Sequence, residues 1–149
     1  MKDQLQLHEI VWYLPYGLQI KILNHKSDYV GIEYAKVNGY YFIADQLHVT
    51  YEGGSTGKDV SIFRPVLRPL SDLEREITTI RGENIVPIEW MEDFYDTHNF
   101  HDQCRQLMDD NRWLNHLDYL VVQHLFEWHF DVRDLIGRNL AVSIYSINK

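Results

Sequence analysis

Cysteine is nearly absent from this 149-residue chain, and no stretch of it stays apolar for long. The lone thiol, Cys104, cannot form an internal disulfide or a thiolate metal cluster within one chain, a usage typical of proteins of the reducing cytosol. No segment approaches the roughly 20 apolar residues of a membrane helix. Polar residues interrupt the N-terminal stretch, so no signal peptide is expected there. We therefore expect a soluble cytoplasmic protein without membrane association.

Positive charge is also scarce, with 14 Lys and Arg residues against 22 Asp and Glu residues and a formal net charge of -8. Residues 1–70 carry seven residues of each sign, whereas residues 71–149 carry seven basic and fifteen acidic ones. Because contact with nucleic-acid phosphates needs a basic surface, we expect no direct nucleic-acid binding. The acidic half is interpreted as a solvated face, with mimicry of nucleic acid by carboxylates as the open alternative.

Large apolar side chains, in contrast, are plentiful: hydrophobic residues make up 45% of the chain, which contains four Trp, ten Tyr and six Phe. A domain of about 150 residues buries roughly 70% of the surface that its unfolded chain exposes. Such a core needs no metal and no cofactor, and we expect none. We predict a single α+β domain over residues 1–149, β-rich in residues 1–70 and helix-rich in residues 71–149.

The β-rich part is predicted from alternation and turn residues. Residues 18–22 alternate apolar and polar side chains, the period-two pattern of a strand with one buried face. Asn38-Gly39 favours the positive φ values of a two-residue hairpin turn. The strand pattern is expected to end at Arg64-Pro65 and Arg68-Pro69, because neither proline can donate to a ladder. We predict an N-terminal antiparallel sheet of four to five strands packed on the C-terminal helices. Its further strands are expected at residues 30–35, 40–44, 47–51 and 60–63.

The helix-rich part begins with a capping signal. Ser71 followed by Glu74 matches a capping box, which predicts a helix over residues 72–80 that ends near Gly82. A second long helix, over residues 114–130, is apolar on most of its circumference, which is typical of a central helix packed on two sides. The other predicted elements are a helix over residues 100–111, a loop or edge strand over residues 85–88, and an edge strand over residues 140–147.

The glycine-rich residues 53–58 match a phosphate-binding P-loop only in composition. Glu52 stands where that motif needs glycine, and Asp59 stands where it needs Ser or Thr. The segment also leads into a predicted strand, whereas phosphate binding needs the N-terminus of a helix. A hairpin loop is the better interpretation.

The histidines are the next candidates for chemistry. His124 and His129 lie five positions apart, so their rings point about 140° apart on a straight helix and cannot share one metal; a buried structural role is predicted for His129. His98, His101 and Asp102 form a better spaced set, since an i, i+3 pair shares one helical face. Solvent-exposed polar residues at a helix start explain this set more simply. No metal site is assigned, and His98, His101 and Asp102 stay the candidates for metal binding.

Carboxylate pairs and hydroxyls offer no firmer catalytic site. Glu89 with Asp93, and Asp109 with Asp110, suit acid–base chemistry or Mg²⁺ ligation. Acidic helix ends and turns produce such pairs routinely, however, and the expected capping role explains Ser71. We therefore assign no catalytic residue.

Aromatic residues in the first half of the chain are the main candidates for binding. Some of them must belong to the core, whereas any that are exposed together would mark a protein-binding surface. We predict such a surface from five residues: Trp12, Tyr13, Tyr16, Tyr40 and Tyr41.

Three segments of the chain are distinctive as strings. They are Leu14-Pro-Tyr-Gly-Leu-Gln-Ile-Lys, then Pro65-Val-Leu-Arg-Pro-Leu-Ser-Asp-Leu, then Glu127-Trp-His-Phe-Asp-Val-Arg-Asp-Leu-Ile with Leu140-Ala-Val. In this order the chain resembles short uncharacterised proteins carried by phages and prophages of gut Bacteroidetes. The resemblance covers most of the chain in scattered form and brings no activity or catalytic residues with it. It implies the cytoplasm of a bacterial host during infection or lysogeny.

In that context we expect a non-enzymatic, protein-binding accessory or anti-defence factor that engages a protein of the host or phage. Two alternatives stay open: a small metal-dependent hydrolase that uses His98, His101 and Asp102, and a virion or assembly component that forms a homo-oligomer.

Overall fold

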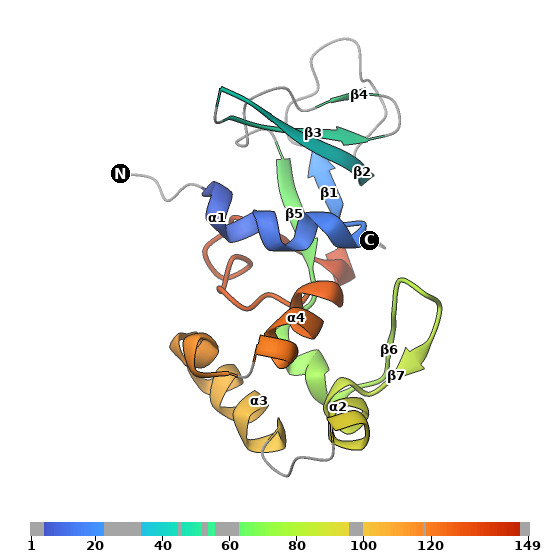
Figure 1. The fold of residues 1–149 in the computed structure, drawn as a ribbon, viewed down its shortest axis with the longest axis vertical. Helices are drawn as coiled ribbons and strands as arrows, with labels where there is room; N and C mark the ends of the chain where they lie inside the picture. The colour runs from blue at the N-terminus through green and yellow to red at the C-terminus, as the bar shows by residue number, and fades with distance from the viewer. Residues whose placement is uncertain are drawn as a thin grey trace. The chain divides into compact units, whose positions relative to one another are not determined.

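The computed structural model describes residues 5–22, 34–44, 46–51, 54–55, 63–95, 100–117 and 119–146 (Figure 1). The chain divides into two compact units, one made of Met1–Leu67 with Leu135–Lys149 and the other of Arg68–Asp134. Strands dominate the first unit and helices the second, so the predicted α+β class is confirmed. The change of composition predicted near residue 70 lies close to this division, but the C-terminal residues belong to the strand-rich unit.

The first unit is built around a six-stranded sheet in the order β4-β3-β2-β1-β5-β8. All pairings are antiparallel except the one between β5 and β8, which is parallel. Of the edge strand predicted over residues 140–147, only Val142–Ser143 pairs with the sheet, as β8, and Ile144–Ser146 forms a 3-10 helix instead. The elements are α1 (Leu7–Ile10), the 3-10 helix η1 (Val11–Tyr16), β1 (Gln19–Ile22), β2 (Tyr34–Ile43), β3 (Gln46–Tyr51), β4 (Gly54–Ser55), β5 (Phe63–Leu67), β8 (Val142–Ser143) and the 3-10 helix η6 (Ile144–Ser146).

The centre of this sheet follows the alternation in the sequence. Ile20 and Ile22 of β1 are buried, and the polar residues that alternate with them, Gln19 and Lys21, are half-buried, as a strand with one core face requires. The expectation that the strand pattern ends at the two proline pairs is wrong for Arg64-Pro65, because Pro65 lies opposite Ile20 within β5. The strand continues to Leu67 and ends immediately before Arg68-Pro69.

The hairpin turn predicted at Asn38-Gly39 is also wrong, because both residues lie inside β2. The register shifts between Val37 and Gly39, so Asn38 is the extra residue of a β-bulge. The hydroxyl of Thr50 on β3 donates to Oδ1 of Asn38 at 2.9 Å and stabilises the bulge. The chain turns five residues after Gly39, between β2 and β3, where Ala44 takes a positive φ of 50°. Of the other predicted strands of the sheet, residues 30–33 and 60–62 lie outside the described residues.

The second unit consists of a short hairpin and several helices. Its elements are the 3-10 helix η4 (Leu70–Glu74), β6 (Ile77–Thr78), β7 (Asn84–Ile85), α2 (Pro87–Tyr95), α3 (Phe100–Asp109), the 3-10 helix η5 (Asn111–His116) and α4 (Tyr119–Glu127). The prediction of a helix over residues 100–111 is confirmed by α3. Pro87 begins α2, a position where its missing N–H leaves no helical hydrogen bond unmade.

The prediction of a helix over residues 72–80 is wrong. The N-cap position is occupied by Pro69, which has no side chain that can accept a capping hydrogen bond, so Ser71 is not the capping residue. The helical turn stops at Glu74. The β-branched pair Ile77–Thr78 then forms β6 and pairs with β7. Gly82, with a φ of 81°, lies in the turn between the two strands.

The helix predicted over residues 114–130 is shorter than expected. It is preceded by η5, and α4 covers only Tyr119–Glu127. Val121 and Leu125 are buried, as the prediction of a central helix requires, but Tyr119 is 74% exposed. The helix is therefore not packed on two sides at its first turn. No helix among the described residues is long and apolar enough to cross a membrane.

Candidate functional site

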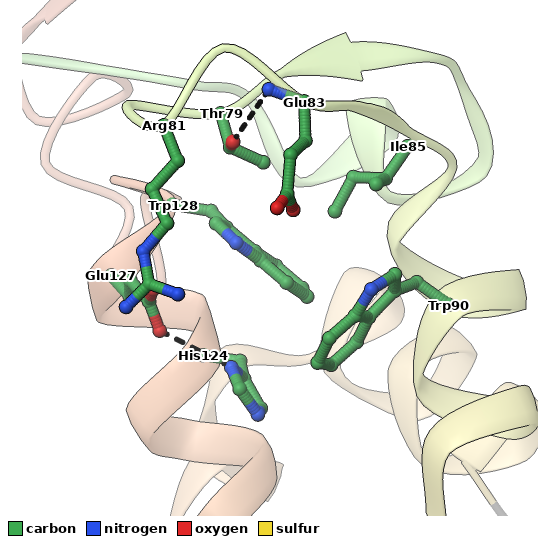
Figure 2. Close-up of a pocket in the computed structure, with 8 residues that line it drawn as sticks. All are labelled: Thr79, Arg81, Glu83, Ile85, Trp90, His124, Glu127 and Trp128. Carbon is green, nitrogen blue, oxygen red and sulfur yellow. Dashed lines mark hydrogen bonds and ion pairs between the residues drawn. The ribbon is translucent and has the colours of Figure 1, made fainter.

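The second unit contains a cavity of about 240 Å³ between its hairpin, α2 and the end of α4 (Figure 2). Pockets that hold drug-sized ligands measure roughly 300–1,000 Å³, so this one suits a smaller group. Its lining combines ring systems with charged side chains. The lining residues are Thr79, Arg81, Glu83, Ile85, Trp90, His124, Glu127 and Trp128.

Three rings form the aromatic part of the lining. His124 and Trp128 are one helical turn apart, and the backbone N–H of Trp128 donates to the carbonyl of His124 at 2.9 Å. Their rings stack, with centroids 5.1 Å apart and planes at 20°. Trp90 approaches from α2 (Figure 2) and stands across both, 5.0 Å from His124 at 72° and 5.4 Å from Trp128 at 89°. We refer to Trp90, His124 and Trp128 as the aromatic cluster.

Charged groups complete the lining. Glu127 lies three residues after His124, and its Oε2 is 3.3 Å from Nδ1 of that imidazole, with both side chains more than four-fifths buried. Arg81 and Glu83 come from the exposed turn of the β6–β7 hairpin. The lining thus contains one guanidinium, from Arg81, and two carboxylates, from Glu83 and Glu127.

The hairpin turn that carries these charges is held by its own hydrogen bonds. The N–H of Thr79 donates to the carbonyl of Glu83 at 2.8 Å, and the N–H of Glu83 donates to Oγ1 of Thr79 at 3.2 Å. The N–H of Gly82 closes the turn on the carbonyl of Thr79 at 2.9 Å. The backbone of Glu83 is therefore fixed at the cavity although its side chain is exposed.

These groups fit the binding of an organic cation. The face of an aromatic ring carries negative electrostatic potential and attracts a cation within about 6 Å of the ring centroid, Trp most strongly. Carboxylates beside the rings add attraction for the same charge. The hydroxyl in the lining, that of Thr79, accepts a hydrogen bond from the N–H of Glu83 within the hairpin turn. Among the described residues there is no group of three or more His, Cys, Asp or Glu side chains placed to hold a metal ion.

The five aromatic residues predicted to form a binding surface do not all lie on a surface. Trp12, Tyr40 and Tyr41 are exposed and Tyr16 is half-buried. Tyr13, in contrast, is fully buried, so it belongs to the core and its assignment to a surface is wrong. The exposed set gains Phe42, which follows Tyr41 on β2, and the ring of Tyr41 stacks on His48 of β3 at 5.0 Å.

The residues considered for a metal site are only partly described. His98 lies outside the described residues, and His101 lies on α3 with a side chain that is not described. Asp102 is exposed, whereas Cys104 two positions later is fully buried. Burial, reinforced by the nearby carboxylates of Glu92 and Glu74, raises the pKa of the Cys104 thiol to about 12. The thiol therefore stays protonated and faces away from Asp102.

Of the carboxylate pair Asp109–Asp110, Asp110 has a structural role. Asp110 caps η5 by accepting from the N–H of Arg112 at 3.0 Å, and it also pairs with the guanidinium of Arg112 at 2.7 Å. These hydrogen bonds hold the pKa of Asp110 below its ordinary value. The interpretation of this pair as an acidic helix end is therefore confirmed for Asp110.

The cavity itself was not predicted. The sequence pattern assigns Trp128 to the predicted helix over residues 114–130 without a binding role, and it raises His124 only as a metal ligand. The available signal was local, because His124, Glu127 and Trp128 are spaced i, i+3 and i+4 and must share one side of a helix. Trp90 carries no such signal, since it reaches the cluster only through tertiary packing.

No protein-family model matches the chain, and neither the curated proteins nor the solved structures that were searched contain a match to it. Inference about function therefore rests on the geometry of the site.

Proposed function

We propose that this protein is a non-enzymatic binding protein whose second unit takes a positively charged group of a protein partner into the aromatic cluster pocket. One observation carries the proposal: Trp90, His124 and Trp128, with ring centroids 5.0 to 5.4 Å apart, line a cavity of about 240 Å³ together with Glu127. In the phage or prophage context implied by the sequence resemblance, such a protein acts as an accessory or anti-defence factor on a host or phage protein.

The electrostatics of the cavity support a cation as the bound group. A cation over a tryptophan face gains about 0.5–1 kcal/mol at an exposed site and about 2 kcal/mol or more when desolvated. Arg81 and Glu83 are both exposed, so solvent and salt screen their charges alike, whereas the carboxylate of Glu127 is more than four-fifths buried and acts at short range. The net charge of -8 also raises the rate at which cationic partners arrive.

The size of the cavity supports the end of a side chain as the bound group. A volume of about 240 Å³ lies below that of pockets for drug-sized ligands. A lysine-type or arginine-type side chain places its charge at the end of an apolar stem, and such a stem can lie along Ile85 while the charge meets the rings. The partner is therefore expected to present one basic side chain from an exposed segment.

The test uses the whole protein and blocked amino acids as probes. Acetyl-lysine amide, its trimethylated form, acetyl-arginine amide and the neutral acetyl-norleucine amide are titrated while the indole N–H signals of the four tryptophans are followed by NMR. We expect at least one cation to shift the signals of Trp90 and Trp128 saturably, and the neutral probe not to do so. Shifts confined to Trp12 and Trp113, or no saturable shift with any cation, would overturn the proposal.

A matched pair of variants sharpens the result. Trp90→Leu removes one ring of the cluster at a half-buried position, whereas Trp113→Leu removes an exposed ring of the same unit outside the cavity. The first is expected to weaken binding of the cationic probe about fivefold or more and the second to leave it unchanged. Circular dichroism of both variants shows whether each keeps its fold.

A further inference from the structure

Resting on the function proposed above, we infer that the aromatic cluster pocket selects a quaternary ammonium group, such as a trimethylated amine, over a primary ammonium or a guanidinium. The three cations share one charge but differ in their hydrogen-bond donors. The contacts already made by the polar groups of the lining favour the cation that needs no acceptor.

The buried acceptors of the cavity are partly engaged within the protein, and the further carboxylate in the lining, that of Glu83, is exposed to water. Oε2 of Glu127 is 3.3 Å from Nδ1 of His124, and Oγ1 of Thr79 accepts from the N–H of Glu83. A primary ammonium brings three N–H donors and a guanidinium brings five, and each donor that loses water must find an acceptor. A trimethylated ammonium brings none, so it enters the cavity without competing for Glu127 or Thr79.

The ring arrangement matches a cation covered by methyl groups. His124 and Trp128 are nearly parallel, and Trp90 stands across both at 72° and 89°, so the lining presents ring surfaces in two planes. Ile85 adds an apolar side chain to the same lining. Methyl groups gain dispersion contacts with such surfaces, and their weak hydration makes the transfer from water less costly than that of a primary ammonium.

The negative charge of the lining distinguishes this cavity from a plain apolar one. Glu83 and Glu127 outnumber Arg81, so a methylated cation is expected to bind better than an uncharged group of the same shape. Two sources can supply this chemistry: a methylated lysine side chain of a protein, or a free choline-like molecule. The proposed function favours the first, and the test separates the two.

The experiment compares affinities for the wild-type protein by NMR titration at one ionic strength. The probes are acetyl-trimethyllysine amide, choline, 3,3-dimethylbutan-1-ol as the uncharged isostere of choline, acetyl-lysine amide and acetyl-arginine amide. We expect acetyl-trimethyllysine amide to bind about tenfold more tightly than acetyl-lysine amide and acetyl-arginine amide, and choline to bind more tightly than its uncharged isostere.

The outcomes separate the selectivity for a quaternary ammonium group from the proposed cation-binding function. Equal or tighter binding of acetyl-lysine amide or acetyl-arginine amide overturns the selectivity and leaves the proposed cation-binding function in place. Absence of binding by every cation overturns both. Tighter binding of choline than of acetyl-trimethyllysine amide supports the selectivity but indicates a small molecule and not a protein side chain as the source.

Variants assign the selectivity to named groups. Glu83→Gln keeps the shape of an exposed side chain and removes one charge, and it is expected to reduce the preference for choline over its uncharged isostere. Trp90→Leu is expected to weaken the binding of the trimethylated probe more than the binding of acetyl-lysine amide. Trp113→Leu is expected to change the affinity for neither probe. A Trp90→Leu variant that weakens both probes equally would contradict the role assigned to the ring.

Discussion

Trp90 and Trp128 meet edge to face, with ring centroids 5.4 Å apart and ring planes at 89°. They come from α2 and from the residue that follows α4, so the contact joins two helices of the second unit. Aromatic pairs in this geometry contribute about 0.5–1.5 kcal/mol beyond the area they bury. The same contact therefore stabilises the unit and shapes the cavity.

The two members of the pair are expected to differ in their contribution to stability. Trp128 is 5% exposed, so Trp128→Ala is expected to lower the free energy of unfolding by about 3–5 kcal/mol, and Trp128→Phe by less, because part of the ring stays in place. Trp90 is half-buried, and Trp90→Ala is expected to cost less than Trp128→Ala. Urea unfolding followed by circular dichroism measures all three. Equal losses for the two alanine variants would contradict the difference in burial.

A second prediction concerns Gly39, which lies beside the bulge in β2. A Cβ added at Gly39 would lie 2.8 Å from Oγ1 of Thr50, closer than packed atoms allow. Gly39→Ala is therefore expected to destabilise the protein by about 1–3 kcal/mol, as overpacking usually does. In the Gly39→Ala/Thr50→Ala variant the clashing atom is gone.

A double-mutant cycle tests this pair by urea unfolding. Thr50→Ala alone is expected to cost about 1 kcal/mol, because it removes the hydrogen bond to Asn38. The double variant is then expected to be more stable than the sum of the two single losses predicts. Strict additivity would show that Gly39 is not limited by its contact with Thr50.

The strands of the first unit show where sequence patterns suffice. The alternation around Ile20 predicts β1 correctly, because a strand with one buried face repeats every second residue whatever its neighbours are. Asn38-Gly39 misleads, because the same flexible residues suit a turn and a bulge. In the bulge that forms, Asn38 accepts a hydrogen bond from Thr50, which lies 12 positions further along the chain, so a local pattern does not contain this information.

The second unit shows the limits of a local signal more clearly. Ser71 and Glu74 satisfy the spacing of a capping box, yet the turn they occupy is a 3-10 helix that ends at Glu74. The competing pattern is the pair Ile77–Thr78, whose hydrogen-bonding partners are Asn84–Ile85 across the turn at Gly82. The cavity needed still more distant information, since Trp90 meets the end of α4 only in the folded unit.

A third prediction concerns a buried ion pair in the first unit. Oε1 of Glu9 lies 2.6 Å from the guanidinium of Arg138, and its Oε2 accepts from the N–H of Gln6 at 2.9 Å. The side chain of Glu9 is 7% exposed, so removing Arg138 leaves a buried carboxylate without its cation. Because Arg138 is itself about one-third exposed, Arg138→Met is expected to cost about 2 kcal/mol rather than the full cost of a deeply buried pair.

The control replaces both charges. Glu9→Leu/Arg138→Met leaves no unpaired charge, and it is expected to be more stable than Arg138→Met alone when both are measured by thermal unfolding at pH 7. A double variant less stable than Arg138→Met would show that the single substitution acts through lost packing of the arginine stem and not through the carboxylate.

A fourth prediction uses the thiol of Cys104 as a reporter of folding. Because the pKa of this thiol is raised to about 12 by burial and by the carboxylates of Glu92 and Glu74, almost none of it is thiolate at pH 8. A thiol-specific reagent is therefore expected to modify the native protein only as fast as it opens, and the protein in denaturant at once. Rapid modification of the native protein at pH 8 would contradict the burial of Cys104.

The raised pKa also sets the sign of a pH effect on stability. The folded state keeps the Cys104 proton up to about pH 12, whereas the unfolded thiol loses it above its ordinary value of 9.0. The folded state thus binds more protons in this window, and the free energy of unfolding falls as pH rises above 9, by up to about 1.4 kcal/mol per pH unit. Cys104→Ala lacks this group, so its free energy of unfolding is expected to fall less steeply between pH 9 and about 11. Parallel slopes for the two proteins would show that the thiol ionises equally in both states.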